Sequence, residues 1–128
     1  MIANITNGIK IEISTQYLLA NSQPEQGHYV FAYHITITNT SEYSVQLLRR
    51  FWRIFDSDYS LHYVEGDGVI GQQPTLAPNQ KFTYDSGCSL KTDLGYMQGY
   101  YTFVNNITNE EFKVQIPRFE LIVPEKLN

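Results

Sequence analysis

The stretch that decides the fold is Tyr29-Val30-Phe31-Ala32-Tyr33-His34-Ile35-Thr36-Ile37-Thr38. Its odd-numbered positions are all aromatic or large aliphatic, and most of its even-numbered positions are small or polar. Successive side chains of a β-strand point to opposite faces of a sheet, so a period of two predicts a strand with one buried face. The run is long for a strand, which indicates a chain built mainly from sheet.

Further runs with strand-like composition lie on both sides of this stretch, and they predict strands at residues 9–13, 45–56, 61–64, 81–88, 100–104, 112–116 and 119–123. In the second of these, the adjacent apolar residues Leu47 and Leu48 break the alternation and predict a β-bulge. Pro117 cannot donate a ladder hydrogen bond, so it predicts a bend or an edge position between the last two strands.

The segments between these runs are rich in Gly, Pro, Asn, Asp and Ser, which favour turn conformations, and no long helical period is visible. Short strands separated by turns favour an all-β chain with two antiparallel sheets packed as a sandwich. Trp52 lies on an early long strand, and we expect it to fill the core between the sheets. At 128 residues, the chain is expected to form one domain spanning residues 1–128.

Composition excludes several classes of function. The formal net charge is −4, which argues against nonspecific binding to nucleic-acid phosphates, so we expect no nucleic-acid partner. No apolar run approaches the ~20 residues of a membrane span, and the first ten residues lack a signal-peptide pattern. The single cysteine, Cys88, forbids an intrachain disulfide and suits a reducing compartment. We therefore expect a cytoplasmic protein with no membrane association.

A glycine-rich segment at residues 64–74 contains Gly66, Gly68 and Gly71 in a formal G-x-G-x-x-G spacing. A dinucleotide site needs a helix to begin at the third glycine, but Pro74 follows and no helical period starts. The favoured interpretation is a tight connection in which glycines adopt positive φ or let chains pass closely. The alternative is a small-anion site in which Gly66, Gly68, Gly71 and Arg50 bind a pyrophosphate or nucleotide.

Arg50 shares its face of the strand with Trp52, so it is predicted to point inward. An inward arginine must be paired or lie where it reaches solvent, and two roles remain open. It could make an ion pair or hydrogen bonds to loop carbonyls, or it could hold an anion near residues 64–74, which we call the glycine loop. Glu65 and Asp67 flank Gly66 and are expected to be solvated.

The histidines and the cysteine do not form a recognisable catalytic or metal-binding pattern. His28 and His34 are six residues apart on one predicted strand, about 20 Å from each other, and His62 lies on a different strand. Cys88 has no sequence neighbour that would activate it as a nucleophile. We expect no catalytic residue, no metal site, no cofactor and no enzymatic activity.

Several ordered segments resemble the ApaG family of small bacterial proteins, also known as CorD. They are residues 29–37 and 45–48, Arg50, Trp52, and residues 66–74, 84–87, 90–92, 95–100 and 116–119. The resemblance implies a fibronectin type III-like or immunoglobulin-like sandwich. It also implies an association with cobalt resistance and magnesium efflux, and a gene that neighbours a diadenosine tetraphosphate hydrolase. Similar domains in eukaryotic F-box proteins, and in a protein that interacts with DNA polymerase delta, resemble protein-interaction modules.

One residue departs from the family pattern, because this chain has Phe51 where the family commonly has histidine between Arg50 and Trp52. A metal or acid–base role for that position therefore does not transfer to this chain.

These observations lead to a first hypothesis of a non-enzymatic binding module with an unidentified protein partner. The predicted contact surface lies near Phe51 and the glycine loop, or at an open sheet edge, which would also permit a homodimer. The alternative is a nucleotide- or pyrophosphate-binding protein linked to diadenosine tetraphosphate metabolism. A sensor of divalent cations is a third hypothesis, for which the sequence offers no convincing ligand set.

Overall fold

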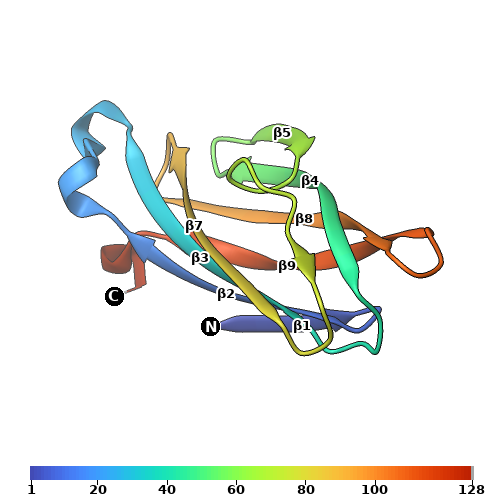
Figure 1. Cartoon of the computed structure of the whole chain (residues 1–128). Coiled ribbons are helices and arrows are strands. Elements are labelled where there is room, and N and C mark those ends of the chain that lie inside the picture. The colour runs from blue at the N-terminus through green and yellow to red at the C-terminus, as the bar shows by residue number, and fades with distance from the viewer. Residues whose placement is uncertain (128) are drawn as a thin grey trace.

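The computed structural model describes residues 1–127 and shows two antiparallel sheets packed face to face, which confirms the predicted sandwich (Figure 1). The first sheet has the strand order β1-β2-β3-β7, and the second has the order β5-β4-β8-β9 with the short β6 beside β4. The strands are β1 (Ile2–Thr6), β2 (Ile9–Tyr17), β3 (Tyr29–Asn39), β4 (Val45–Asp56), β5 (Ser60–Asp67), β6 (Thr75–Leu76), β7 (Lys81–Leu90), β8 (Leu94–Asn105) and β9 (Glu111–Ile122).

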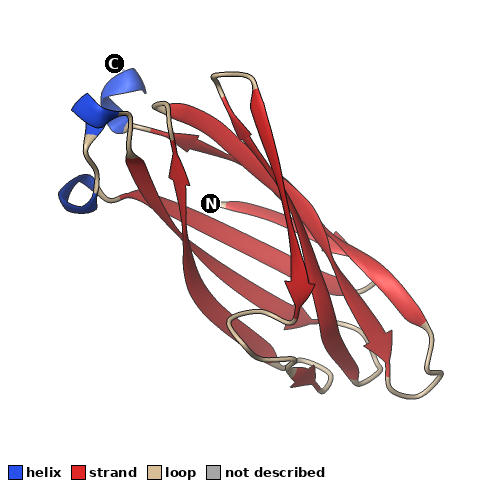
Figure 2. Ribbon diagram, turned by 90° about the horizontal axis from the view of Figure 1, so that it is seen from above, coloured by secondary structure: helices blue, strands red, loops and turns tan. Residues whose placement is uncertain are grey.

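Helical structure within residues 1–127 is limited to three short 3-10 turns, which gather at one end of the sandwich (Figure 2). They are η1 (Leu19–Asn21), η2 (Pro24–Gln26) and η3 (Pro124–Leu127). None of these helices in the described chain has the length and apolarity needed to cross a lipid bilayer.

Strand β3 corresponds to the stretch that predicted the fold, and it lies between β2 and β7 in the first sheet. Its residues Phe31, Tyr33, Ile35 and Ile37 are buried, as the alternation predicts. Trp52, from the opposite sheet, is 3% exposed and contacts Phe119 and Tyr101 edge-on, with ring centres 5.8 and 6.5 Å away. The predicted tryptophan core is therefore confirmed.

The predicted bulge in β4 is present, because the pairing of β4 with β8 shifts register between Leu47 and Arg49. Before the shift, the odd-numbered Leu47 is buried in the core, whereas after it the even-numbered Trp52 is buried. One extra residue thus reverses which side chains of β4 face inward. As a consequence, Arg50 points into the sandwich and Phe51 lies on the outer face of the second sheet.

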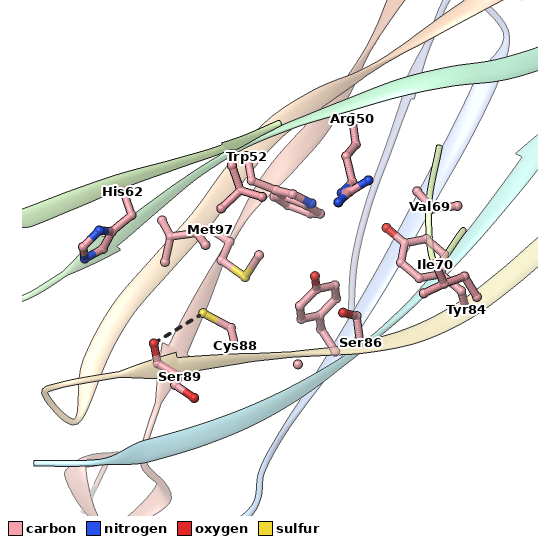
Figure 3. A pocket seen from close by; sticks show the side chains of 14 residues that line it. Arg50, Trp52, His62, Val69, Ile70, Tyr84, Ser86, Cys88, Ser89 and Met97 are labelled. Atoms are coloured by element: carbon pink, nitrogen blue, oxygen red, sulfur yellow. Dashed lines mark hydrogen bonds between the residues drawn. The ribbon is translucent and has the colours of Figure 1, made fainter. Parts of the chain in front are cut away.

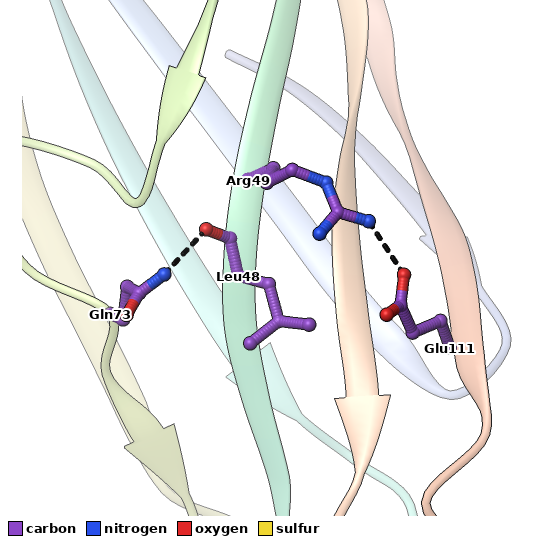
Figure 4. A network of polar contacts seen from close by, with 4 residues as sticks. All are labelled: Leu48, Arg49, Gln73 and Glu111. Carbon is purple, nitrogen blue, oxygen red and sulfur yellow. Dashed lines mark hydrogen bonds and ion pairs between the residues drawn. The ribbon is translucent and has the colours of Figure 1, made fainter.

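The bulge residue Leu48 is fastened by the glycine loop. Its carbonyl oxygen accepts hydrogen bonds from the Gly68 N–H at 2.8 Å and from the Gln73 side-chain amide at 2.9 Å (Figure 4). Beside it, the guanidinium of Arg49 forms an exposed ion pair with Glu111 at 2.5 Å across the outer face. A bulge leaves a residue outside the regular ladder, and here the loop replaces the missing hydrogen bonds.

The two strands predicted at residues 112–116 and 119–123 are one strand, β9, so their separation was wrong. The register between β8 and β9 shifts where Met97 pairs with Phe119 and Gly99 pairs with Ile116. Between these pairs, one residue of β8 opposes two of β9, so that the bulge around Pro117 keeps both Ile116 and Phe119 in the core. Pro117 also lies on an edge strand, as predicted.

The hairpin of β1 and β2 was not predicted. Its turn contains Asn7 and Gly8, which both adopt positive φ, at 51° and 80°. An Asn-Gly pair is a strong signal for a two-residue hairpin, because both residues tolerate that conformation. The weak alternation of β1, whose Ile2 and Ile5 are exposed, hid this edge strand.

The two sheets close on one side and stay apart on the other. Strand β9 packs against β1 and β2, whereas the opposite edges, β5 and β7, are not paired with each other in the described chain. The side chains between β5 and β7 border the cleft described next.

Candidate functional site

A cleft of about 470 Å³ opens between the edges formed by β5 and β7 (Figure 3). One wall is apolar and is formed by Trp52, Ile54, Val64 and Met97. Arg50 and His62 come from the same sheet as this wall, and the polar side chains of Tyr33, Tyr84 and Ser86 approach from the first sheet. A concave site of this size with an apolar wall and a few polar groups has the form of a small-molecule pocket.

Arg50 points inward, as predicted, and its surroundings match the structural interpretation. Its Nη1 donates hydrogen bonds to the carbonyl oxygens of Asp67 and Gly68, each at 3.0 Å. Within residues 1–127, no carboxylate forms an ion pair with this guanidinium. Arg50 thus holds the glycine loop while its charge stays without a counter-ion in the described chain.

The three predicted glycines occupy different environments. Gly66 lies on β5 beside Arg50, and a Cβ there would lie 3.1 Å from Nη1 of that arginine. Gly68 has a φ of +62°, and a Cβ would lie 2.1 Å from the carbonyl oxygen of Gln72. Gly71 has a φ of +76° with open space around it. Positive φ and close approach therefore explain two of these glycines, and proximity to Arg50 explains the third.

Three backbone N–H groups of the glycine loop donate to backbone carbonyl oxygens. The N–H of Gly68 donates to Leu48, and Val69 and Gln72 exchange backbone hydrogen bonds of 2.8 Å each. These groups are engaged with carbonyl oxygens and are not aimed into the cleft as a phosphate cradle would require. Anion binding by Gly66, Gly68, Gly71 and Arg50 together stays a prediction.

Three tyrosine hydroxyls approach the floor of the cleft. Those of Tyr84 and Tyr101 are hydrogen-bonded at 2.6 Å, joining β7 of the first sheet to β8 of the second. Burial raises the pKa of Tyr84, Tyr101 and Tyr33 above the usual value, and the nearby Arg50 only partly offsets this. All three are therefore neutral hydroxyls at physiological pH.

Cys88 also lines the cleft, where burial raises the pKa of its thiol to about 11. A thiol with this pKa is protonated at neutral pH, and the thiolate is the reactive form. The structure thus places Cys88 in an unreactive environment.

His34 and His62 lie on different strands, as predicted, but the prediction that His28 shares the strand of His34 was wrong, because His28 precedes β3 and forms an isolated bridge with Gln23. His34 lies on the outer face of the first sheet, where its Nδ1 is 2.8 Å from a carboxylate oxygen of Asp85. His62 faces the cleft from β5. No group of three or more His, Cys, Asp or Glu side chains in residues 1–127 has an arrangement that could hold a metal ion.

The outer face of the second sheet carries a second candidate surface. Phe51 stacks on Tyr63 and Tyr100, with ring centres 5.9 and 5.1 Å away, and we call these three residues the aromatic face. The guanidinium of Arg53 lies 5.5 Å from the centre of the Phe51 ring, and Nζ of Lys113 lies 4.5 Å from that of Tyr100. Cations at these distances are attracted to the ring faces.

Two features extend the aromatic face. A further stacked pair, Phe55 and Tyr96, lies along the same sheet with ring centres 5.0 Å apart, and Arg118 lies 3.8 Å from the centre of Tyr96. A shallow hollow of about 300 Å³ beside Phe51 is bordered by Glu65 and other residues of β4, β5 and β8.

Sequence reasoning located Phe51 on this surface but missed Tyr63 and Tyr100. The predicted bulge makes Phe51 point outward, but the register that brings Tyr63 and Tyr100 beside it comes from the pairing of β4 with β5 and β8.

Comparison with known proteins agrees with this architecture. Residues 19–105 match the model of the ApaG domain family. A protein named ApaG from Vibrio cholerae serotype O1 is 47% identical over 120 residues, which cover 94% of each chain. One of the same name from Shewanella sediminis is 42% identical over 125 residues, or 98% of each chain.

A solved structure supports the same assignment. The crystal structure reported for an ApaA protein from Bordetella pertussis superposes with a TM-score of 0.87 at 39% identity and covers 95% of each chain. The full-length similarity in sequence and the shared sandwich show that this chain belongs to the ApaG domain family.

Proposed function

We propose that this protein is a non-enzymatic binding module that recognises a partner protein through its aromatic face. The observation that carries the proposal is the stack of Tyr63, Phe51 and Tyr100 across three strands, on a face that the described chain leaves open. Buried partner contacts concentrate on tyrosine, tryptophan and arginine side chains, because these combine a large apolar area with few rotatable bonds or several donors.

The surroundings of the aromatic face fit the rim of a protein interface. Arg49 and Glu111 form an ion pair at its border, and Arg118 and Glu120 form another, and all four side chains are exposed. Exposed pairs of this kind contribute little to stability, but they set the orientation of a charged partner.

The chemistry of the cleft supports a binding role over a catalytic one. Tyr33, Tyr84 and Cys88 are protonated at neutral pH because burial raises the pKa of each side chain. None of them is poised as a general base or nucleophile, which need a pKa near or below the working pH.

The proposal is tested by affinity capture from the cytoplasmic fraction of the source cell. Tyr63→Ala is the test variant and Tyr43→Ala is its control, because Tyr43 is a comparably exposed tyrosine on a loop away from the aromatic face (48% against 61% exposed). We expect a specific partner to bind the wild type and Tyr43→Ala equally, and to bind Tyr63→Ala at least about tenfold more weakly.

Phe51→Ala provides a second arm, because its ring contacts both tyrosines of the stack. Circular dichroism and thermal unfolding confirm that each variant is folded before its affinity is measured. A partner that binds Tyr63→Ala and Phe51→Ala as tightly as the wild type would refute the assignment of this face.

A further inference from the structure

The cleft between β5 and β7 has a charge character opposite to that of the whole chain. The protein has a formal net charge of −4, but no aspartate or glutamate lines the cleft. Arg50 is its permanently charged side chain, and His62 is the other basic group that lines it. The cleft therefore favours a ligand that carries negative charge.

Arg50 retains donor capacity toward such a ligand. Its two hydrogen bonds both come from Nη1 and both end on neutral carbonyl oxygens, leaving Nη2 and Nε without a hydrogen-bond acceptor in residues 1–127. Figure 3 shows the guanidinium directed into the cleft, on the side of Trp52 and Tyr84. A half-buried guanidinium without a carboxylate partner is stabilised by an anion that accepts from its remaining N–H groups.

The rest of the cleft favours a ligand with an apolar part next to its charged group. Ile54, Val64 and Met97 line the cleft, and Figure 3 shows Met97 on the side of Trp52 and His62. The neutral hydroxyls of Tyr33 and Tyr84 can donate to one anionic group, but they add no positive charge. A single arginine matches a monoanion, whereas a pyrophosphate would need more cations or free loop amides than the cleft presents.

We propose that this cleft binds a small amphipathic carboxylic acid, with its carboxylate at Arg50 and its apolar body against Ile54, Val64 and Met97. The aromatic face and the cleft lie on opposite faces of the second sheet, and Arg50 borders both the cleft and the hollow beside Phe51.

The test is a chemical-shift titration of the isotopically labelled full chain with phenylbutyrate and with octanoate. The neutral control is phenylbutyramide, which keeps the apolar body and lacks the charge. We expect saturable shifts at the Met97 methyl and at the amides of Gly68 and Ser86, with the acid binding at least about tenfold more tightly than the amide. Equal affinities for acid and amide, or no saturable shift with either acid at millimolar concentration, would overturn the proposal.

A matched pair of variants at Val64 tests the charge without disturbing Arg50. Val64 lies on the edge strand β5, is partly exposed and makes none of the hydrogen bonds of Arg50. Both variants lose the apolar contact of Val64, but we expect Val64→Glu to weaken binding of the acids at least about tenfold more than Val64→Lys does. Equal effects of the two variants would contradict a site selected by charge.

Inorganic pyrophosphate serves as the last arm and separates this site from a general anion site. Pyrophosphate could shift the NMR signals of the same residues with an affinity equal to or higher than that of phenylbutyrate. In that case the apolar part of the acid has no role in binding and the proposal fails. In that case the alternative of a nucleotide- or pyrophosphate-binding protein gains support.

Discussion

The hydrogen bond between Tyr84 and Tyr101 offers a quantitative test of how the two sheets are held together. Tyr101 is fully buried, Tyr84 is 5% exposed at the floor of the cleft, and their hydroxyls lie 2.6 Å apart. Replacing either residue with phenylalanine removes one hydroxyl and leaves the other without its partner. A buried polar group that loses its partner costs more than the bond itself contributed.

The two single substitutions should not be equal. In Tyr84→Phe, the hydroxyl of Tyr101 stays in the core away from water, so we expect a loss of about 1–3 kcal/mol in the free energy of unfolding. In Tyr101→Phe, the hydroxyl of Tyr84 borders the cleft and can turn to water, so we expect about 0.5–1.5 kcal/mol. The double variant leaves no orphaned hydroxyl and should cost less than the sum of the two.

The assay is urea unfolding with linear extrapolation. Equal slopes of the unfolding free energy against urea concentration in all variants would confirm that the unfolded state is unchanged. Tyr43→Phe is the matched control, because it removes an exposed hydroxyl and should change the unfolding free energy by less than about 0.5 kcal/mol. If the double variant costs the full sum of the single variants, the hydroxyls do not depend on each other and the reasoning is refuted.

Three further predictions concern the same framework. Because burial raises the pKa of Tyr84 and Tyr101 in the folded state, the unfolded chain releases these protons first as the pH rises above about 10. Stability should therefore fall in alkaline solution, by up to ~1.4 kcal/mol per pH unit for each tyrosine, and less in the double phenylalanine variant; identical alkaline profiles in urea unfolding would contradict this. Gly99→Ala should cost at least about 3 kcal/mol in thermal unfolding, because its Cβ would lie 1.9 Å from a carbonyl oxygen of the neighbouring strand β4. In contrast, Gly71→Ala should cost about 1 kcal/mol, for its positive φ alone. Asp56→Ala should destabilise the fold by about 2–4 kcal/mol, because this buried carboxylate accepts two backbone N–H bonds, of 2.6 and 3.2 Å, from the turn between β7 and β8; a loss below 0.5 kcal/mol by urea unfolding would refute that role.

The fold was accessible from the sequence wherever burial alternates cleanly. The pattern of β3 predicted its burial residue by residue, and the doublet Leu47-Leu48 predicted the bulge, because a bulge is a local event that breaks a local period. The pattern failed at Pro117, where a bulge in β9 was taken for a gap between strands, because only the pairing with β8 shows that the ladder continues.

The candidate sites were less accessible because they depend on pairing between distant strands. The inward direction of Arg50 followed from the position of Trp52, and the choice between its two roles required the carbonyls of Asp67 and Gly68 to be placed in space. Likewise, the aromatic face joins Tyr63 and Tyr100 from strands far apart in sequence, and no local period records that register.

The bulge at Leu48 has a consequence for exchanging segments between this chain and other sandwich proteins. On its N-terminal side, β4 contributes odd-numbered residues to the interior, and on its C-terminal side it contributes even-numbered ones. A chimaera joined within β4 keeps its core only if it contains the bulge residue Leu48 and the glycine loop that binds it. That loop must include Gly68 and Gln73, which donate hydrogen bonds to the Leu48 carbonyl oxygen. Without them, Arg50 and Trp52 would turn to solvent and Phe51 would turn inward. The β4 strand and its glycine loop therefore have to be transferred together.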